Sequence, residues 1–295
     1  MSEGDQMAQP IDTENYETIR YDMPAERVAR ITLSRVAQRN AQNKRMLYEL
    51  NSAFDRAIAD NDVRVVVLAA DGPHFSSGHD MADTAKVTEF PQVNVAGPFL
   101  NEGQLGFMAV EEEIYLGMCW RWRNLPKPTI AQVHGKVIAG GCMLVWPCDL
   151  VICSDDATFS DPVVAFGVNG VEYFAHPWEL GIRKAKEMLF TGDALTAAEC
   201  KELGMVNHVV SRAELEPFTL AMAEKIAQRP MMGLKLAKMS CNQAQDAQGF
   251  YNALQAAFSL QHLGHSHNQQ VFGMAADPAG AGIIRAMNRP VGQDR

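Results

Sequence analysis

The chain has 295 residues, 47% of them hydrophobic and 21% charged, and a formal net charge of -9 at pH 7. That length suffices for one large domain with a substantial core, or for one domain with a smaller appendage. The negative charge argues against a nucleic-acid-binding surface and against binding to an anionic membrane.

The beginning of the chain and its apolar runs bear on where the protein resides. Residues 1–15 are polar and acidic, unlike a secretory or transit segment, and no run of about 18 apolar residues predicts a membrane span. The six cysteines form no C-x-x-C pair and several lie in apolar runs, which favours a reduced, buried set over disulfides. We expect a cytoplasmic protein with no membrane insertion and a disordered tail over residues 1–14.

The first part of the chain alternates predicted strands with one predicted helix. Segments 16–23 and 28–35 alternate apolar and polar residues, as paired strands do. Residues 46–58 carry apolar side chains at helical spacing and predict an amphipathic helix. Residues 63–70 then predict a buried strand, followed by a loop in which Gly78 permits a tight turn and Asp80 stands near the start of a helix.

Residues 84–104 depart from this compact pattern. Pro91, Gly97 and Pro98 and the lack of periodicity predict a loop or short lid, with an oligomer contact as the alternative. A helix is expected over residues 105–124. We interpret its run of glutamates, residues 111–113, as a solvated face.

Residues 127–168 organise the candidate site. They predict a buried strand, a turn with the pair Gly140 and Gly141, an apolar helix, and a second strand that leads to an Asp-Pro pair. Small residues in the first turn of a helix leave backbone N–H groups uncovered at the positive end of the helix dipole, where they stabilise an anion. If this turn converges with the Gly78 loop on one oxygen, the two form an oxyanion hole, which usually supplies the largest single term in acyl-group chemistry.

Two segments carry a recognisable pattern: FSSGHDMAD at residues 75–83 and KPTIAQVHGKVIAGGCMLVWPCDLVICSDDATFSDP at residues 127–162. Both resemble signature segments of the crotonase family, also called the enoyl-CoA hydratase/isomerase family, and the match extends over about residues 16–210. The resemblance implies the crotonase (ClpP/crotonase-like) fold, an α/β spiral of repeated ββα units with a C-terminal helical region. It also implies that the oxyanion N–H groups are those of His79 and Gly140. The expected substrate contacts are Asp80, Met81, Gly141, Met143 and Val163.

The family pattern differs at two positions. In the hydratases the turn reads GGGCE and the later strand GQPE, and the two Glu residues handle the water and the α-proton. Here GGCM places Met143 at the first position and SDPV places Val163 at the second, and neither side chain can transfer a proton. Addition of water needs one group to activate it and one to deliver the α-proton. We therefore expect weak or no hydration of crotonyl-CoA.

Two carboxylates are candidate catalytic groups in place of those glutamates. Related members that hydrolyse thioesters or shift double bonds carry an acidic residue near position 172, so the resemblance implies Glu172 as acid or base; a surface carboxylate is the alternative. Asp161 stands two residues before Val163 on a predicted strand, where both side chains point the same way. A turn residue before Pro162 is the alternative for Asp161.

Two histidines are further candidates. His176 is a candidate base, although its neighbours Pro177 and Trp178 suit a packed helix start equally well. The His79 side chain stands where the family usually has a small residue. It is therefore a candidate for contacting CoA, for narrowing the pocket or for acid/base work.

Other patterns give no support for a metal or a bound cofactor. Cys142 is interpreted as a buried small apolar residue rather than a nucleophile. The segment HLGHSH places His262, His265 and His267 at a spacing that could hold a metal, but no carboxylate or Cys accompanies them, which favours an exposed helix end or a subunit contact. We expect no metal and no cofactor other than the coenzyme A of the substrate.

The last part of the chain, residues 211–295, is expected to be helical and to follow a core domain of residues 15–210. Segments 213–228, 233–243 and 249–263 carry apolar residues at helical spacing. In the family such helices pack on a neighbouring subunit within trimers, often paired into hexamers. The resemblance therefore implies oligomerisation through this region, as a homotrimer or a dimer of trimers.

The sequence predicts an acyl-CoA thioester enzyme of this family that uses an oxyanion hole to stabilise a thioester enolate. Because both hydratase glutamates are replaced, an acyl-CoA hydrolase or isomerase using Glu172 is one alternative. A non-catalytic acyl-CoA-binding protein is another. Arg39 and Lys44, near the first helix, are expected by position to contact the CoA phosphates.

Overall fold

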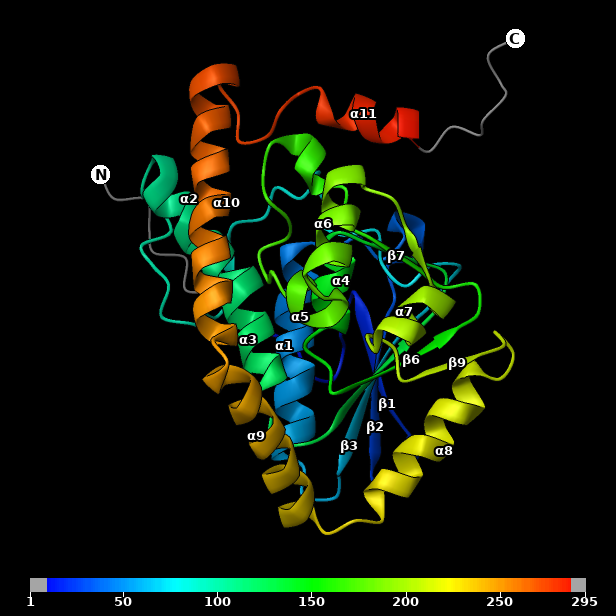
Figure 1. Ribbon diagram of the computed structural model, residues 1–295. Helices are drawn as coiled ribbons and strands as arrows, with labels where there is room; N and C mark the ends of the chain where they lie inside the picture. Colours follow the sequence, from blue (N-terminus) through cyan, green and yellow to red (C-terminus); the bar gives the residue numbers. More distant parts are fainter. Residues whose placement is uncertain (1–9, 288–295) are drawn as a thin grey trace.

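A six-stranded sheet forms the centre of the computed structural model, which describes residues 10–287 (Figure 1). Its strands are ordered β1-β2-β3-β4-β6-β9. β1 is antiparallel to β2, and each later neighbour in this order pairs in parallel. The strands span Ile19–Ala25 (β1), Val28–Leu33 (β2), Val65–Ala70 (β3), Thr129–Val133 (β4), Leu150–Ser154 (β6) and His208–Val210 (β9).

Strand β3 contributes to two hydrophobic layers. Val65 and Val67 belong to the layer that contains α8 (Leu215–Ala227), whereas Val66 and Leu68 belong to the layer that contains α1 (Lys44–Ala59). Successive side chains of a strand point to opposite faces, so one strand serves both layers. In Figure 1, α1 and α8 lie on opposite sides of β1, β2 and β3.

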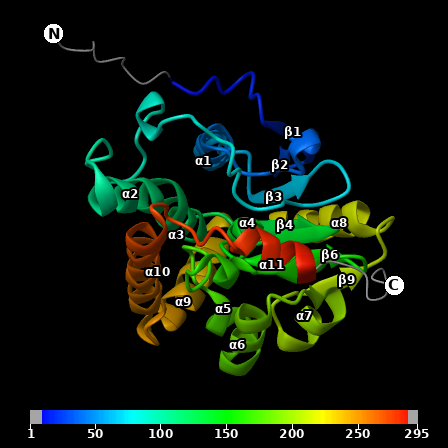
Figure 2. The same cartoon turned by 90° about the horizontal axis from the view of Figure 1, so that it is seen from above.

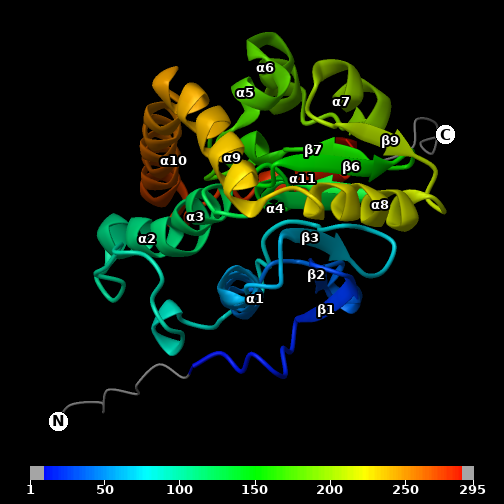
Figure 3. The ribbon, with the colours of Figure 1, turned by 90° about the horizontal axis from the view of Figure 1, so that it is seen from below.

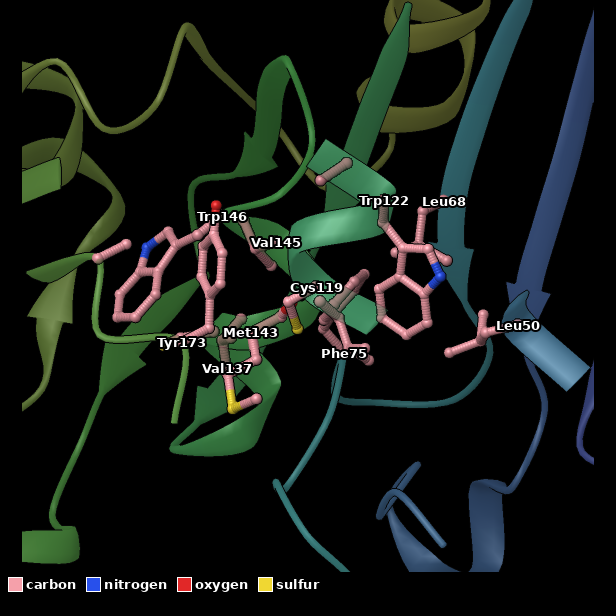
Figure 4. Close-up of a cluster of buried hydrophobic side chains, with 14 of the residues drawn as sticks. Leu50, Leu68, Phe75, Cys119, Trp122, Val137, Met143, Val145, Trp146 and Tyr173 are labelled. Atoms are coloured by element: carbon pink, nitrogen blue, oxygen red, sulfur yellow. The ribbon is translucent and has the colours of Figure 1, made fainter. Parts of the chain in front are cut away.

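A second sheet carries the turn with the Gly pair. Its strands are ordered β5-β7-β8, with β5 parallel to β7 and β7 antiparallel to β8. They span Lys136–Ile138 (β5), Thr158–Ser160 (β7) and Leu195–Thr196 (β8). Helix α4 (Gly140–Val145) begins almost directly after β5 and is buried along its whole length. Met143 and Val145 of α4 lie in a buried cluster with Trp146 and Tyr173 (Figure 4).

The strands and the helix predicted for the first part of the chain are confirmed. α1 begins after Asn43, whose side-chain oxygen accepts a hydrogen bond from the Met46 N–H at 3.0 Å. This N-cap satisfies one of the backbone donors that a helix leaves free at its start.

The helix predicted to begin near Asp80 is wrong. Residues 81–86 form turns and loop, followed by a 3-10 turn, Val87–Glu89. The Asp80 carboxylate pairs with Arg35 at 2.9 Å and accepts from the Ala82 N–H at 3.1 Å. Its oxygens are therefore engaged by an ion pair and a local turn rather than by the first turn of a helix.

The helix predicted over residues 105–124 is confirmed as one continuous helical segment. It consists of α2 (Gly103–Glu111), a π-helical turn (Glu112–Gly117) and α3 (Met118–Arg123). Such π-helical turns occur frequently at functional sites.

The interpretation of the glutamate run as a solvated face is wrong for two of its members. Glu111 is only 7% exposed and Glu113 is 0% exposed. Glu113 accepts hydrogen bonds from the Val93 and Asn94 N–H groups at 2.6 and 2.8 Å, and from the Tyr48 hydroxyl at 3.2 Å. The carboxylate of Glu113 thus attaches the loop of residues 84–104 to α1.

Three helices end the described chain, namely α9 (Met231–Ala247), α10 (Phe250–Phe272) and α11 (Gly280–Met287). The helical segments predicted for this region are confirmed, and α10 extends beyond the predicted 249–263. Figure 2 shows α9 and α10 beside α3, and Figure 3 shows α9 running between α8 and α10. Lys238 of α9 pairs with Asp149 at 2.8 Å, so the C-terminal region contacts the core of its own chain.

The remaining helices cover the edge of the small sheet. They are α5 (His176–Leu180), α6 (Ile182–Thr191) and α7 (Ala197–Leu203), with 3-10 turns at Val36–Gln38 and Val163–Phe166. The six cysteines are free, but the expectation of a buried set is wrong for Cys241, which is exposed, and Cys148 is only partly buried. No helix within residues 10–287 is long and apolar enough to cross a membrane. Of the tail predicted over residues 1–14, residues 1–9 lie outside the described residues.

Removal of the Glu113 carboxylate should destabilise the fold strongly. Glu113→Ala leaves two N–H groups and one hydroxyl without their acceptor, and we expect a loss of about 3 kcal/mol in the free energy of unfolding, measured by urea denaturation. Glu112→Ala is the matched control on the same turn, because Glu112 is partly exposed; we expect a change within about 0.5 kcal/mol. Equal losses in the two variants would contradict this assignment.

Candidate active site

The two Gly-containing loops lie against each other. A Cβ atom added to Gly78 would stand 3.3 Å from the Gly140 nitrogen and 2.8 Å from the Ile138 carbonyl oxygen. Gly78 also has φ +91°, a conformation that favours glycine. A parallel bridge between Ser76 and Val137 holds the two segments in register. The two Gly-containing loops are therefore adjacent in the fold.

The backbone around these loops leaves two N–H groups available. The Gln42 N–H donates to the Gly78 carbonyl at 2.8 Å and the Asp80 N–H donates to the Gln42 carbonyl at 2.9 Å, which occupies the groups on either side of His79. Gly140 is the first residue of α4 and so has no acceptor within the helix. Among the described residues, neither the His79 nor the Gly140 N–H donates to a backbone carbonyl.

The imidazole of His79 lies over the Gly140 turn. A Cβ atom added to Gly140 would stand 2.5 Å from the His79 Cε1 atom. The His79 ring also stacks on Tyr115 of the π-helical turn, with the ring centroids 4.0 Å apart. The His79 Nε2 atom is 3.0 Å from Glu172 Oε2, in hydrogen-bonding geometry. The residue that contributes one of the free N–H groups is thus joined through its side chain to a carboxylate.

The carboxylate of Glu172 is buried and held by two side chains. Glu172 is 4% exposed, and Gln261 Nε2 of α10 donates to its Oε1 atom at 2.9 Å. Burial acts to raise the pKa of Glu172, but the charge and hydrogen bond of His79, with help from Gln261, lower it below its ordinary value. The site therefore holds an ionised carboxylate in a largely apolar surrounding.

Asp161 and His176 form a separate pair. Both are 0% exposed, and His176 Nε2 lies 2.8 Å from Asp161 Oδ2. Asp161 also accepts from the N–H groups of Val163 and Val171, at 3.2 and 3.0 Å. The prediction that Asp161 and Val163 share a strand is wrong, because Val163 begins a 3-10 turn. By accepting from these two N–H groups, Asp161 stabilises the turn around Pro162, which agrees with its alternative interpretation as a turn residue.

The two positions at which the resemblance implies a glutamate in the hydratases contain apolar side chains. Met143 of α4 is 1% exposed within the core, and Val163 packs against the same cluster. Gly141 lies so close to Ser76 that an added Cβ atom would stand 2.9 Å from the Ser76 carbonyl oxygen. Met81, by contrast, is 84% exposed.

The proposed phosphate contacts lie beside the first loop. The Arg39 carbonyl accepts from the Ser77 N–H at 3.0 Å, which places Arg39 next to the Gly78 turn. Lys44 Nζ is 3.2 Å from Asp83 Oδ2, so its charge is already paired. Of the two cations, Lys44 is therefore the one whose charge is already paired with a carboxylate.

The sequence did not reveal three residues that surround this site. Gln261 and Tyr115 carried no recognisable signal, and Glu111 belonged to a run that resembled a solvated face. His262 and His265 are not at an exposed helix end, as was expected: they are 6% and 9% exposed in the middle of α10. Within residues 10–287, no group of three His, Cys, Asp or Glu side chains has the geometry to hold a metal ion.

A cavity of about 580 Å³ lies away from the His79–Glu172 pair. Residues 10–13, 48–59, 91–93 and Arg121 line it. Its lining includes neither of the two Gly turns.

Comparison with known proteins places this geometry in context. The family model described as enoyl-CoA hydratase/isomerase matches residues 24–276. EchA13 of Mycobacterium tuberculosis, which carries an enoyl-CoA hydratase name, is 44% identical over 280 residues, covering 92% of this chain and 87% of its own. The human enoyl-CoA hydratase domain-containing protein 3, mitochondrial, is 34% identical over 214 residues, covering 70% of this chain and 64% of its own.

Solved structures agree. A probable enoyl-CoA hydratase from Mycobacterium thermoresistibile superposes with a TM-score of 0.81 at 47% identity, covering 88% of this chain and 99% of that one. One from Mycobacterium smegmatis gives 0.80 at 46% identity, covering 88% and 98%. The crotonase fold expected from the two sequence segments is confirmed.

The contact between Gly140 and the His79 ring can be tested by a double-mutant cycle. Gly140→Ala should displace the ring and break its bond to Glu172, which we expect to cost about 1.5–3 kcal/mol in the free energy of unfolding. In a His79→Ala background the same change should cost less than about 0.5 kcal/mol, because the obstructing ring is gone. Equal costs in the two backgrounds, measured by urea denaturation, would refute the placement of the ring.

Proposed function

The chain belongs to the enoyl-CoA hydratase/isomerase family, and we propose that it is an acyl-CoA enzyme whose thioester oxygen is bound by the N–H groups of His79 and Gly140. Two preorganised donors aimed at one oxygen stabilise the negative charge that develops there when a thioester forms an enolate. The closeness of the two loops and the availability of both N–H groups support this role.

Glu172 is the proposed base of the reaction. The observation that carries the proposal is its hydrogen bond to His79, the residue whose own N–H faces the oxygen. An ionised carboxylate beside the oxyanion turn can take a proton from a carbon in conjugation with the thioester. The electron pair then moves to the carbonyl oxygen, where the N–H groups of His79 and Gly140 stabilise it.

Proton transfer on carbon is favoured over water addition. Met143 and Val163 supply no proton carriers at the hydratase positions, and Glu172 is almost fully buried. Double-bond migration in an enoyl-CoA needs no water in the site and begins with one proton abstraction. We therefore propose isomerisation of an unsaturated acyl-CoA as the reaction class, with Arg39 and Lys44 near the CoA phosphates. The Asp161–His176 pair supports the loop that carries Glu172.

A panel of CoA thioesters tests the function. Unsaturated and saturated thioesters are screened for thermal stabilisation of the protein, and each mixture is then analysed by mass spectrometry and chromatography. Stabilisation together with an isomeric product of unchanged mass is expected. Product heavier by one water from crotonyl-CoA, formed rapidly, would refute isomerisation. Binding without product would identify a non-catalytic acyl-CoA-binding protein, and free CoA would identify a hydrolase.

Substitution of the base should separate catalysis from binding. Glu172→Gln retains an acceptor for Gln261 but cannot take a proton, so we expect kcat to fall about 10²–10⁴-fold while thermal stabilisation by the ligand persists. Glu112→Gln serves as the control, since Glu112 belongs to the neighbouring π-helical turn and has no contact with Glu172. Unchanged turnover in Glu172→Gln would exclude it as the base.

A homotrimer, the building block of a dimer of trimers, is the proposed assembly. The C-terminal helices expose apolar side chains to solvent: Met232, Leu236 and Met239 on α9, and Leu260, Leu263 and Val271 on α10. Exposed apolar patches of this kind mark protein contacts. Light scattering should give three times the chain mass, and Leu236→Glu with Leu263→Glu should yield a smaller species. Lys235→Glu, at an exposed position of α9, is the control; a monomeric wild type would refute the assembly.

A further inference from the structure

A second buried carboxyl group, that of Glu111, lies beside the Glu172 site. Consecutive residues of α10 reach the two groups: Gln261 donates to Glu172 Oε1 at 2.9 Å, and His262 Nε2 lies 3.3 Å from Glu111 Oε2. On the other side, Tyr115 follows Glu111 by one helical turn and stacks on His79, which in turn bonds to Glu172. The two carboxyl groups therefore frame one buried region from α2 and from the loop before α5.

The histidines that face Glu111 show where its proton is. His265 Nδ1 lies 2.7 Å from the Ala275 carbonyl oxygen, which can only accept, so Nδ1 carries the hydrogen. His262 Nδ1 lies 3.2 Å from Gln104 Oε1 and donates to it in the same way. In a neutral imidazole whose Nδ1 is protonated, Nε2 presents a lone pair.

Both Nε2 lone pairs are directed toward the same carboxyl oxygen. Glu111 Oε2 is 3.3 Å from the Nε2 of His262 and 3.7 Å from that of His265, and all three atoms are buried without a hydrogen-bond partner. A carboxylate oxygen between two lone pairs would be repelled, whereas the O–H of a carboxylic acid can donate to either. The arrangement is therefore satisfied when the proton resides on Glu111.

We propose that Glu111 is a protonated carboxylic acid in the resting protein and a second catalytic residue, which donates a proton to the acyl chain after Glu172 has removed one. This inference rests on the proposed function and extends it. Glu172 and Glu111 would act as base and acid on different carbons of one conjugated acyl group.

The electrostatics of the surrounding groups agree with this assignment. Burial raises the pKa of Glu111 well above its usual value, and the negative charge of Glu172 raises it further. Burial, followed by the neighbouring His265, lowers the pKa of His262 to about 4. When the surroundings of two carboxyl groups shift their pKa values apart, the group with the higher pKa can act as the acid and the group with the lower pKa as the base. The titratable groups around Glu111 are Tyr115 on its own helical segment, His262 and His265 on α10, and Glu172 with His79 beyond Tyr115.

The proton balance of the reaction closes with these two residues. Glu172 breaks one C–H bond and keeps the proton, and the electron pair forms the enolate. Glu111 then gives its proton to another carbon, the enolate electrons form the new C–H bond, and the carbonyl is restored. No electrons leave the substrate. Glu172 ends protonated and Glu111 ionised, and exchange of one proton each with water after product release resets both.

The protonation state can be measured without any substrate. The full chain is labelled with ¹³C at the side-chain carboxyl carbon of glutamate, and the resonance that disappears in Glu111→Gln is assigned to Glu111. We expect this resonance at the position of a neutral carboxyl at pH 7, with a change only at higher pH. A resonance at the ionised position across pH 6–8 would overturn the proposal. Glu111→Met, which fills similar space without a polar side chain that ionises, provides the assignment if the Gln variant does not fold.

The catalytic role is tested with the thioester that the wild type converts. Glu111→Gln should lower kcat about 10²-fold or more. Wild-type kcat should decrease at alkaline pH as Glu111 loses its proton. The residual kcat of Glu111→Gln should show no such decrease. Glu112→Gln is the matched control and should keep the wild-type profile.

The two proposals fail in different ways. If Glu172→Gln loses turnover but Glu111→Gln keeps it with an unchanged pH profile, the role of Glu111 is refuted while the proposed function stands. If the wild type converts no thioester, the proposed function is refuted and the catalytic role of Glu111 with it, although the resonance still reports its protonation state.

Discussion

The hydrogen bond between His79 and Glu172 is the interaction on which the candidate site depends. It connects the loop after β3 with the loop before α5, two segments far apart in sequence. Because the His79 ring also lies over Gly140, and Gln261 of α10 holds the other oxygen of Glu172, four parts of the chain meet at one carboxylate. Loss of this contact would leave a buried charge with one remaining side-chain donor.

A buried carboxylate costs free energy unless it is paired. Here the cost is offset by the His79 imidazole and by Gln261, each within hydrogen-bonding distance of one carboxylate oxygen. The burial that makes the carboxylate costly in free energy also strengthens its electrostatic interactions, because the local dielectric constant is low. The two hydrogen bonds fix the orientation of this buried carboxylate, as the proposed role of general base requires.

Much of the fold could be predicted from local patterns, but the composition of the site could not. Alternating residues in β1 and β2 and the apolar spacing of α1 are local signals, and they identified those elements correctly. The turn with the Gly pair, which leads from β5 into α4, was recognised from local residues for the same reason. Glu111 and Glu113 were misjudged because a run of charges ordinarily faces solvent, and their burial depends on partners in distant segments. His262 and His265 were misjudged likewise, since nothing in their spacing reveals Glu111 opposite them.

The replacement of both hydratase glutamates has a geometrical consequence. The positions at which the resemblance implies those glutamates lie on α4 and on the 3-10 turn after β7, and they hold Met143 and Val163. Two buried carboxyl groups, those of Glu172 and Glu111, stand in the loop before α5 and in α2, and both are contacted by neighbouring residues of α10. In the proposed reaction, these two groups would act on other carbons of the acyl chain than the pair that hydrates a double bond. If the turn binds the thioester oxygen as we propose, this arrangement favours a change of reaction over a loss of catalysis, because a turn used only for binding would not require a buried carboxylate beside it.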